Sequence, residues 1–246
     1  MSDVWSYDLY VPSRSSLEPR ELGDIQLLMK KVGFSPVNPL TGIIVVSRVD
    51  ESSLELIQLE YEDLESISPS TRADGSILTI WKGNVDADIG FGLKPDLQRE
   101  FRLLSERGNI SVSRLSIMID GTLFRDHDAG RNGIASDIQT LFSDLCDYFH
   151  ARYGYSYNEG TAEAFFGGLN VWKRISLQGN PRQLFWLNFF PNERLPGINL
   201  KEMISLGGKA VNTKTGVFVF FSDHPWEIDL DSLRDLNNAW LRVLSQ

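Results

Sequence analysis

Cysteine is almost absent from this chain of 246 residues: Cys146 is the only one, so no disulfide can form within it. A chain of this length can bury an adequate core without disulfides or metals. A lone cysteine is typical of a reducing compartment. Long apolar runs and a secretory signal pattern at the N-terminus are also missing. We therefore expect a cytoplasmic protein that does not cross a membrane.

Familiar ligand-binding motifs are missing as well. The chain has no phosphate-binding glycine loop and no dinucleotide fingerprint. The segment 126–137 is spaced like a calcium loop, but Arg131 stands where an EF-hand requires glycine and Asp137 where it requires glutamate. A polar loop that caps the following helix is the better interpretation. We predict no metal and no cofactor.

The three histidines, His127, His150 and His224, do not have the spacing of paired metal ligands. Asp223 precedes His224 and could orient it as a base, but no motif for a nucleophile accompanies the pair. Cys146 falls on the apolar stripe of a predicted helix, which favours a buried thiol. The sequence thus predicts a protein that is not an enzyme. An enzyme with a site around Asp223 and His224 remains the alternative.

Negative charge is concentrated in one segment. The chain carries 33 acidic and 24 basic residues, a net charge of −9. Residues 50–88 hold ten of the carboxylates against only Arg72 and Lys82, so this segment alone carries −8. Such a field repels nucleic acid and anionic membranes and attracts basic partners. A solvated segment that only aids solubility is the other interpretation.

Hydrophobic periodicity predicts about nine strands and five helices, with hairpins more frequent than β-α-β units. This indicates an α+β fold with mostly antiparallel, mixed sheet and about five helices packed on one side. No linker interrupts the chain, so we expect a single compact domain over 1–246. It has two subdomain-like halves, 1–108 and 109–246.

Several elements can be placed individually. Alternation from Trp5 to Val11 predicts a strand, and Pro19 opens a helix. A hairpin is predicted around Gly83-Asn84, with Asp86 and Asp88 on the solvent face of its second strand. Further predicted elements are helices over 95–107 and 134–149, a polar tyrosine-rich connection over 152–160, and a strand over 169–177.

The C-terminal block 183–246 runs from an aromatic strand through a short helix, a Gly-Gly stop and a hairpin to a closing helix. In this order it resembles the C-terminal part of immunity proteins from bacterial polymorphic-toxin and type VI secretion systems. The resemblance covers 165–246 best, and its matching positions are Trp186, Leu187, Asn188, Phe189, Gly207, Gly208, Gly216, Pro225 and Trp240. It implies a cytoplasmic protein that binds and blocks a toxin made beside it. The toxins of such systems include nucleases, which are commonly basic where they grip phosphate.

Under this hypothesis the acidic segment is the toxin-binding surface. The charged candidates are Glu60, Glu62, Asp63, Glu65, Asp86 and Asp88, and the apolar anchors are Tyr61 and Trp81. Tyr153, Tyr155 and Tyr157 form a second possible contact surface. For each of these residues taken singly, an ordinary solvated surface position is the favoured interpretation. A structural or adaptor subunit of a secretion or phage-related assembly is a third hypothesis, and the sequence leaves the toxin and the oligomeric state open.

Overall fold

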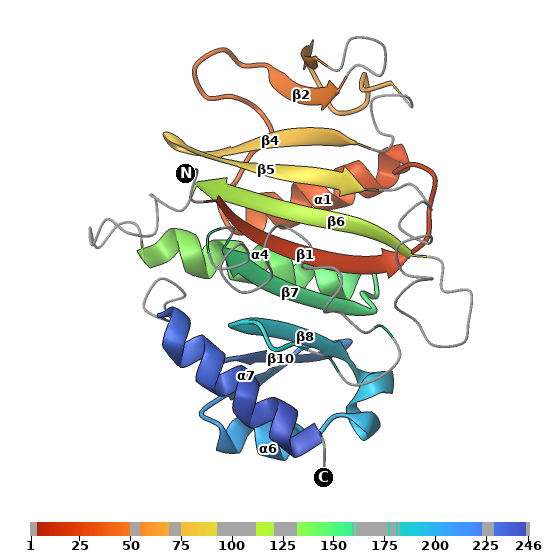
Figure 1. The fold of residues 1–246 in the computed structure, drawn as a ribbon. Coiled ribbons are helices and arrows are strands. Elements are labelled where there is room, and N and C mark those ends of the chain that lie inside the picture. Colours follow the sequence, from red (N-terminus) through yellow and green to blue (C-terminus); the bar gives the residue numbers. More distant parts are fainter. Residues whose placement is uncertain are drawn as a thin grey trace.

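The computed structural model describes residues 4–49, 55–68, 75–92, 112–120, 132–158, 160, 177, 181, 183–222 and 229–244. These residues form an antiparallel sheet of ten strands in the order β3-β2-β4-β5-β6-β1-β7-β8-β10-β9 (Figure 1). The strands are β1 (Val4–Pro12), β2 (Ile44–Val49), β3 (Leu56–Tyr61), β4 (Ser76–Lys82), β5 (Val85–Gly92), β6 (Val112–Asp120), β7 (Tyr153–Asn158), β8 (Leu187–Pro191), β9 (Lys209–Asn212) and β10 (Gly216–Phe220). The prediction of an α+β fold with mostly antiparallel sheet is confirmed.

The two middle strands of the sheet, β1 and β6, each lie beside strands from the other half of the chain. β1 and β6 pair along their whole length, from Val4↔Asp120 to Pro12↔Val112. β1 then pairs with β7 of the second half, while β6 pairs with β5 of the first half. The sheet therefore runs without a break through both predicted halves, and neither half contains its own complete set of strands.

The helices lie on both faces of this sheet. α1 (Pro19–Lys31) and α4 (Asn132–Tyr148) cover one face, where they meet Tyr7 and Leu9 of β1. α7 (Leu230–Leu244), α6 (Leu200–Ser205) and the 3-10 helix η2 (Asn192–Gly197) lie on the other face over β8 and β10, with Trp240 in the same buried cluster as Tyr10. In Figure 1, α1 and α4 are behind the sheet and α7 is in front. The expectation that the helices pack on one side was therefore wrong.

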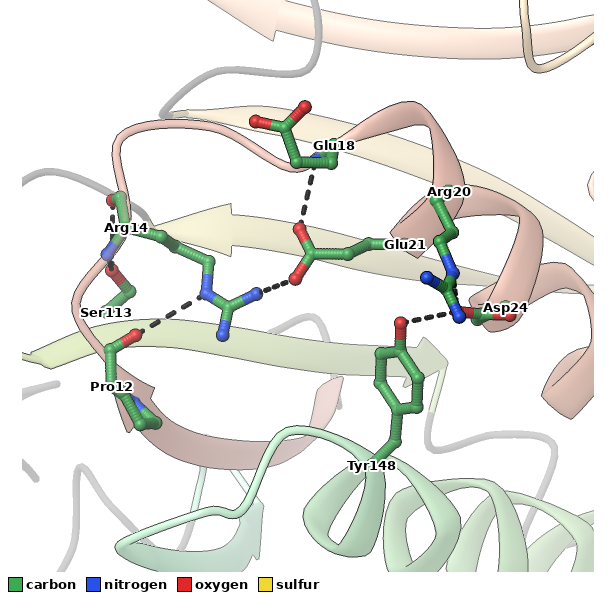
Figure 2. A network of polar contacts seen from close by, with 8 residues as sticks. All are labelled: Pro12, Arg14, Glu18, Arg20, Glu21, Asp24, Ser113 and Tyr148. Atoms are coloured by element: carbon green, nitrogen blue, oxygen red, sulfur yellow. Dashed lines mark hydrogen bonds and ion pairs between the residues drawn. The ribbon is translucent and has the colours of Figure 1, made fainter.

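Figure 2 shows how the start of α1 is attached to the end of the central strand β1 and to α4. Arg14 donates to the Pro12 carbonyl at 3.4 Å and pairs with Glu21. The second carboxylate oxygen of Glu21 accepts the Glu18 amide at 2.9 Å, which completes a capping box at the helix N-terminus. Tyr148 of α4 donates to Asp24 of α1 at 2.6 Å. Polar contacts, together with the packing of the core, therefore hold α1 in place against β1 and α4.

The largest local correction concerns 152–160, which was predicted as a polar connection and instead contains β7, an inner strand. Its tyrosines project to one face, and Gly154 and Ser156 project toward α4. A β-carbon at Gly154 would lie 2.9 Å from the ring of Phe142. The small residues allow α4 to approach the sheet closely, so neither face of β7 has the aliphatic pattern that usually indicates a strand.

Other predicted elements were confirmed. β1, α1, α4 and the β4–β5 hairpin lie where periodicity placed them, and Gly83 has the positive φ of 61° that favours glycine at the first position of the turn. The predicted helix over 95–107 and the predicted strand over 169–177 lie outside the described residues, except for Leu177. Within the described ranges, no helix is long and apolar enough to span a membrane.

Candidate protein-binding surface

The strand order brings the predicted acidic residues to one end of the sheet. Tyr61, the last residue of β3, pairs with Ile44, the first residue of β2. The β4–β5 turn, which leads to Asp86, lies at the same end of the sheet. The segment that precedes β2 connects the two, because its Val37 pairs with Ile44 of β2 and its Ser35 pairs with Trp81 of β4. We call this surface the acidic end; its exposed members are Glu60, Glu62, Asp63, Glu65 and Asp86.

Within the acidic end, three carboxylates share one face of the sheet. Glu60 is opposite Val45, and the register continues through Thr79 of β4 to Asp88 of β5. Glu60 and Asp88 are therefore three strand spacings apart, about 14 Å. Asp86 points to the same face, two residues from Asp88. This face is the one that α1 and α4 do not cover.

Glu62, Asp63 and Glu65 occupy a turn beyond β3 rather than the sheet itself. Leu64 and Ile67 of this turn are buried in the core beside α1 and α4. Asp63 accepts the Ser66 amide at 2.7 Å, which holds the turn in place. The turn therefore continues the charged surface around the strand ends toward the helix-covered side, so the six predicted carboxylates do not form one compact cluster.

Asp88 differs from the other predicted carboxylates because it is half-buried. Burial raises the pKa of its carboxyl; the hydrogen bond from Thr79 at 2.8 Å opposes this, and the charge of Asp86 adds to it. Asp86 and Asp88 do lie on the same face of β5, as predicted. Only Asp86 is exposed to solvent, however, so the predicted exposure of Asp88 was wrong. Asp86 is the residue of the pair that a partner could reach directly.

Lys82, the last residue of β4, does not neutralise this surface. Lys82 forms an ion pair with Asp137 of α4 and donates to the Val32 carbonyl at 3.0 Å. Its ammonium group is thus directed to the α1 and α4 side of the sheet, where it fastens β4 to α4. The exposed carboxylates keep their negative field.

The two predicted anchors are only partly available. Tyr61 packs against the core on the α1 and α4 side. Trp81 is half-buried, and its backbone exchanges hydrogen bonds of 2.7 and 2.8 Å with Ser35. The predicted second surface of tyrosines was wrong, because Tyr153 and Tyr155 are fully buried among the strands and α7. Tyr157 of the same strand is half-buried.

Two features of the structure have no counterpart in the sequence analysis. One is Leu40, which is 89% exposed at the tip of a turn directly before β2. The other is a buried polar network on the sheet face opposite α1. There Asp8 accepts Ser116 Oγ at 2.6 Å and Tyr155 OH at 3.0 Å, and lies 4.0 Å from Arg114. In the sequence, the only indication of this network was a charged residue, Asp8, between apolar residues of a predicted strand.

Most residues of the enzyme alternative lie outside the described part of the chain. Asp223, His224 and 126–131 lie outside it, and Asp137 is engaged by Lys82. Cys146 is buried, and burial raises the pKa of its thiol, which confirms the structural interpretation. His150 is exposed just after α4 with a φ of 50°. Among the described residues, no group of three or more His, Cys, Asp or Glu side chains could hold a metal.

No protein-family model and no curated protein sequence matches this chain.

Proposed function

We propose that this chain is an immunity protein, which binds a cognate bacterial toxin in the cytoplasm through the acidic end and thereby blocks it. The carrying observation is the gathering of five exposed carboxylates from β3, the turn after it and the β4–β5 hairpin, while Lys82 is paired with Asp137. The resemblance of the C-terminal block to such immunity proteins gives the class of partner.

The mechanism is electrostatic complementarity on a rigid support. Carboxylates on paired strands and on a turn anchored by Leu64 and Ile67 keep fixed positions. They can pair with the Lys and Arg side chains with which a nuclease toxin holds phosphate. Long-range attraction between such surfaces raises the association rate and sets the orientation, and it weakens as salt screens it. A toxin whose basic site is covered in this way cannot reach its nucleic acid.

The direct test is to co-produce this chain with the protein encoded beside it, followed by affinity capture and a growth assay. A stable complex that restores growth is the expected result. A neighbouring protein that is toxic, yet is neither bound nor neutralised, would overturn the proposal.

Charge reversal then locates the surface. The double substitution Glu60→Lys and Asp86→Lys should slow association by about tenfold or more at low salt and flatten its dependence on ionic strength. The matched control is Glu193→Lys with Asp231→Lys, which changes the net charge equally at exposed positions of η2 and α7. If the control slows association as much as the test pair, the acidic end is not the binding surface.

A further inference from the structure

We propose that Leu40 is the apolar anchor of the acidic end, and that it enters an apolar pocket of a protein partner whose surface around that pocket is basic. This inference rests on the proposed function and supplies what that function lacks. Carboxylates guide association, but affinity at protein interfaces comes mainly from a few side chains that become fully desolvated in well-packed pockets of the partner. Tyr61 and Trp81, the anchors expected from the sequence, are partly buried in this protein's own structure.

Leu40 is held at the apex of a turn whose shape is fixed before any partner arrives. The Asn38 amide donates to the Ile43 carbonyl at 2.8 Å, and the Gly42 amide donates to the Asn38 carbonyl at 2.9 Å. The Asn38 side-chain oxygen accepts the amides of Leu40 at 2.8 Å and Thr41 at 3.4 Å. Gly42 has a φ of 73°, which an L-residue with a side chain rarely adopts. An anchor presented in this way loses little conformational entropy on binding.

A single exposed leucine is common on soluble proteins. Among the described residues, Leu40 differs from the other exposed leucines in its larger exposed fraction and in its position in the fold. It is 89% exposed, compared with 65% for Leu27 on α1 and 60% for Leu56 at the start of β3. It also projects from a turn rather than from the side of a helix or strand.

The turn stands between the two acidic segments. It leads directly into β2, where Ile44 pairs with Tyr61, and Glu62 and Asp63 follow Tyr61 in sequence. On the other side, the chain before the turn pairs through Ser35 with Trp81, which is opposite Asp86 on β5. In Figure 1 the chain leading into β2 and the β4–β5 turn both lie on the left of the sheet. An apolar tip flanked by carboxylates on both sides matches a pocket with a basic rim.

The charge around Leu40 selects this occupant over a second copy of the chain. Two copies meeting through this surface would place their carboxylates against each other, and like charges across an interface oppose association. The same carboxylates that repel a second copy attract a basic protein. The partner is therefore expected to have Lys or Arg side chains around an apolar cavity large enough for one leucine.

The experiment measures binding kinetics of the purified protein encoded beside this chain to four forms of the chain: the wild type, Leu40→Ala, Leu40→Lys and Leu27→Ala. Leu40→Ala should raise Kd about ten- to a hundredfold, mainly through faster dissociation, since a rim charge acts on association and a buried anchor acts on dissociation. Leu40→Lys should have a larger effect, because it adds a positive charge against a basic rim. Leu27→Ala, the same change at an exposed helix position, should leave Kd unchanged.

The outcomes separate the two proposals. If the wild type binds the neighbouring protein and the Leu40→Ala and Leu40→Lys variants bind it with the same Kd as the wild type, the role of Leu40 is overturned and the proposed function still stands. A wild-type chain that does not bind the neighbouring protein would overturn both. Because Leu40 contacts solvent in the free protein, the melting temperatures of all four forms should agree, which shows that any change in Kd is not a folding defect.

Discussion

At the level of single residues, Asp8 is a charged side chain that the fold buries almost completely. It is buried in the middle of the sheet, where hydroxyl groups of Ser116 and Tyr155 donate to its two oxygens. Arg114 on the neighbouring strand lies 4.0 Å away and supplies a countercharge. A buried carboxylate is tolerated only when such partners replace its lost hydration.

Replacing Asp8 with asparagine should therefore destabilise the protein by about 2–4 kcal/mol, because charge-assisted hydrogen bonds are lost and Arg114 loses its countercharge. Urea unfolding followed by circular dichroism measures this difference. The same Asp→Asn change at Asp231, an exposed residue of α7, serves as the control and should have little effect. Equal stability of Asp8→Asn and the wild type would mean that the network does not contribute to folding.

The tyrosines give a pH prediction. Burial raises the pKa of Tyr7, Tyr10, Tyr153 and Tyr155, and burial together with the hydrogen bond to Asp24 raises the pKa of Tyr148 to about 12. In the unfolded chain tyrosine ionises near pH 10. Because the pKa values of these tyrosines are higher in the folded protein, the free energy of unfolding is unaffected by their ionisation below about pH 10 and decreases as the pH rises above that value.

Tyrosinate absorbance and circular dichroism should be followed together as pH is raised. Only the more accessible tyrosines should ionise before the fold is lost, and the buried ones should ionise together with unfolding. Ionisation of all the tyrosines near pH 10 with an unchanged circular dichroism spectrum would contradict this prediction.

At the scale of elements, close approach between backbones and rings decides which glycines are required. A β-carbon at Gly216, the first residue of β10, would lie 2.3 Å from the Phe190 carbonyl oxygen and 2.7 Å from ring atoms of Phe189. For Gly23, inside α1, no heavy atom other than those of its chain neighbours and the backbone of its own helix lies within 4 Å of the corresponding position. Identical substitutions at these two glycines should therefore change stability in opposite directions.

Gly216→Ala should cost about 1–3 kcal/mol or more, because β10 must move away from β8. Gly23→Ala should instead stabilise by about 0.5–1 kcal/mol, because alanine restricts the unfolded chain and favours the helix. Thermal unfolding of both variants beside the wild type measures the contrast. A stable Gly216→Ala variant would indicate that the β8–β10 pairing is looser than described.

At the scale of the whole molecule, the sheet has a protected centre and two exposed edges. β6, β1 and β7 each have a partner strand on both sides, and both faces of β1 are buried. Among the strands that the structure describes, β3 and β9 each pair with one other strand, and every residue of β9 is exposed. The acidic end belongs to the β3 side of the sheet, and the Trp240 core belongs to the β9 side.

Amide hydrogen exchange should follow this order. Amides of β1, β6 and β7 should exchange only through global unfolding, so their exchange free energies should approach the overall free energy of unfolding. Amides of β9 and the outward amides of β3 should exchange fastest among the strands. Protection of β9 equal to that of β1 would indicate an additional strand partner in solution.

Elements whose signals are local could be predicted from the amino-acid sequence. Alternation defines β1, helical periodicity defines α1 and α4, and Gly83-Asn84 defines the β4–β5 turn, since each signal lies within one short segment. Segregation of charge also identified the acidic segment. The burial of Cys146 followed from its place on the apolar stripe of α4.

Features that depend on contacts between distant residues could be seen only in the folded protein. The exchange of β1 and β6 between the halves is set by pairing across more than a hundred residues, which no local pattern records. β7 was missed because its tyrosines are polar in composition, yet α7 and neighbouring strands bury them. The exposure of Tyr61, Trp81 and Leu40 was likewise decided by packing. Tyr61 packs against the core, Trp81 is half-buried, and the turn of Leu40 is left in solvent.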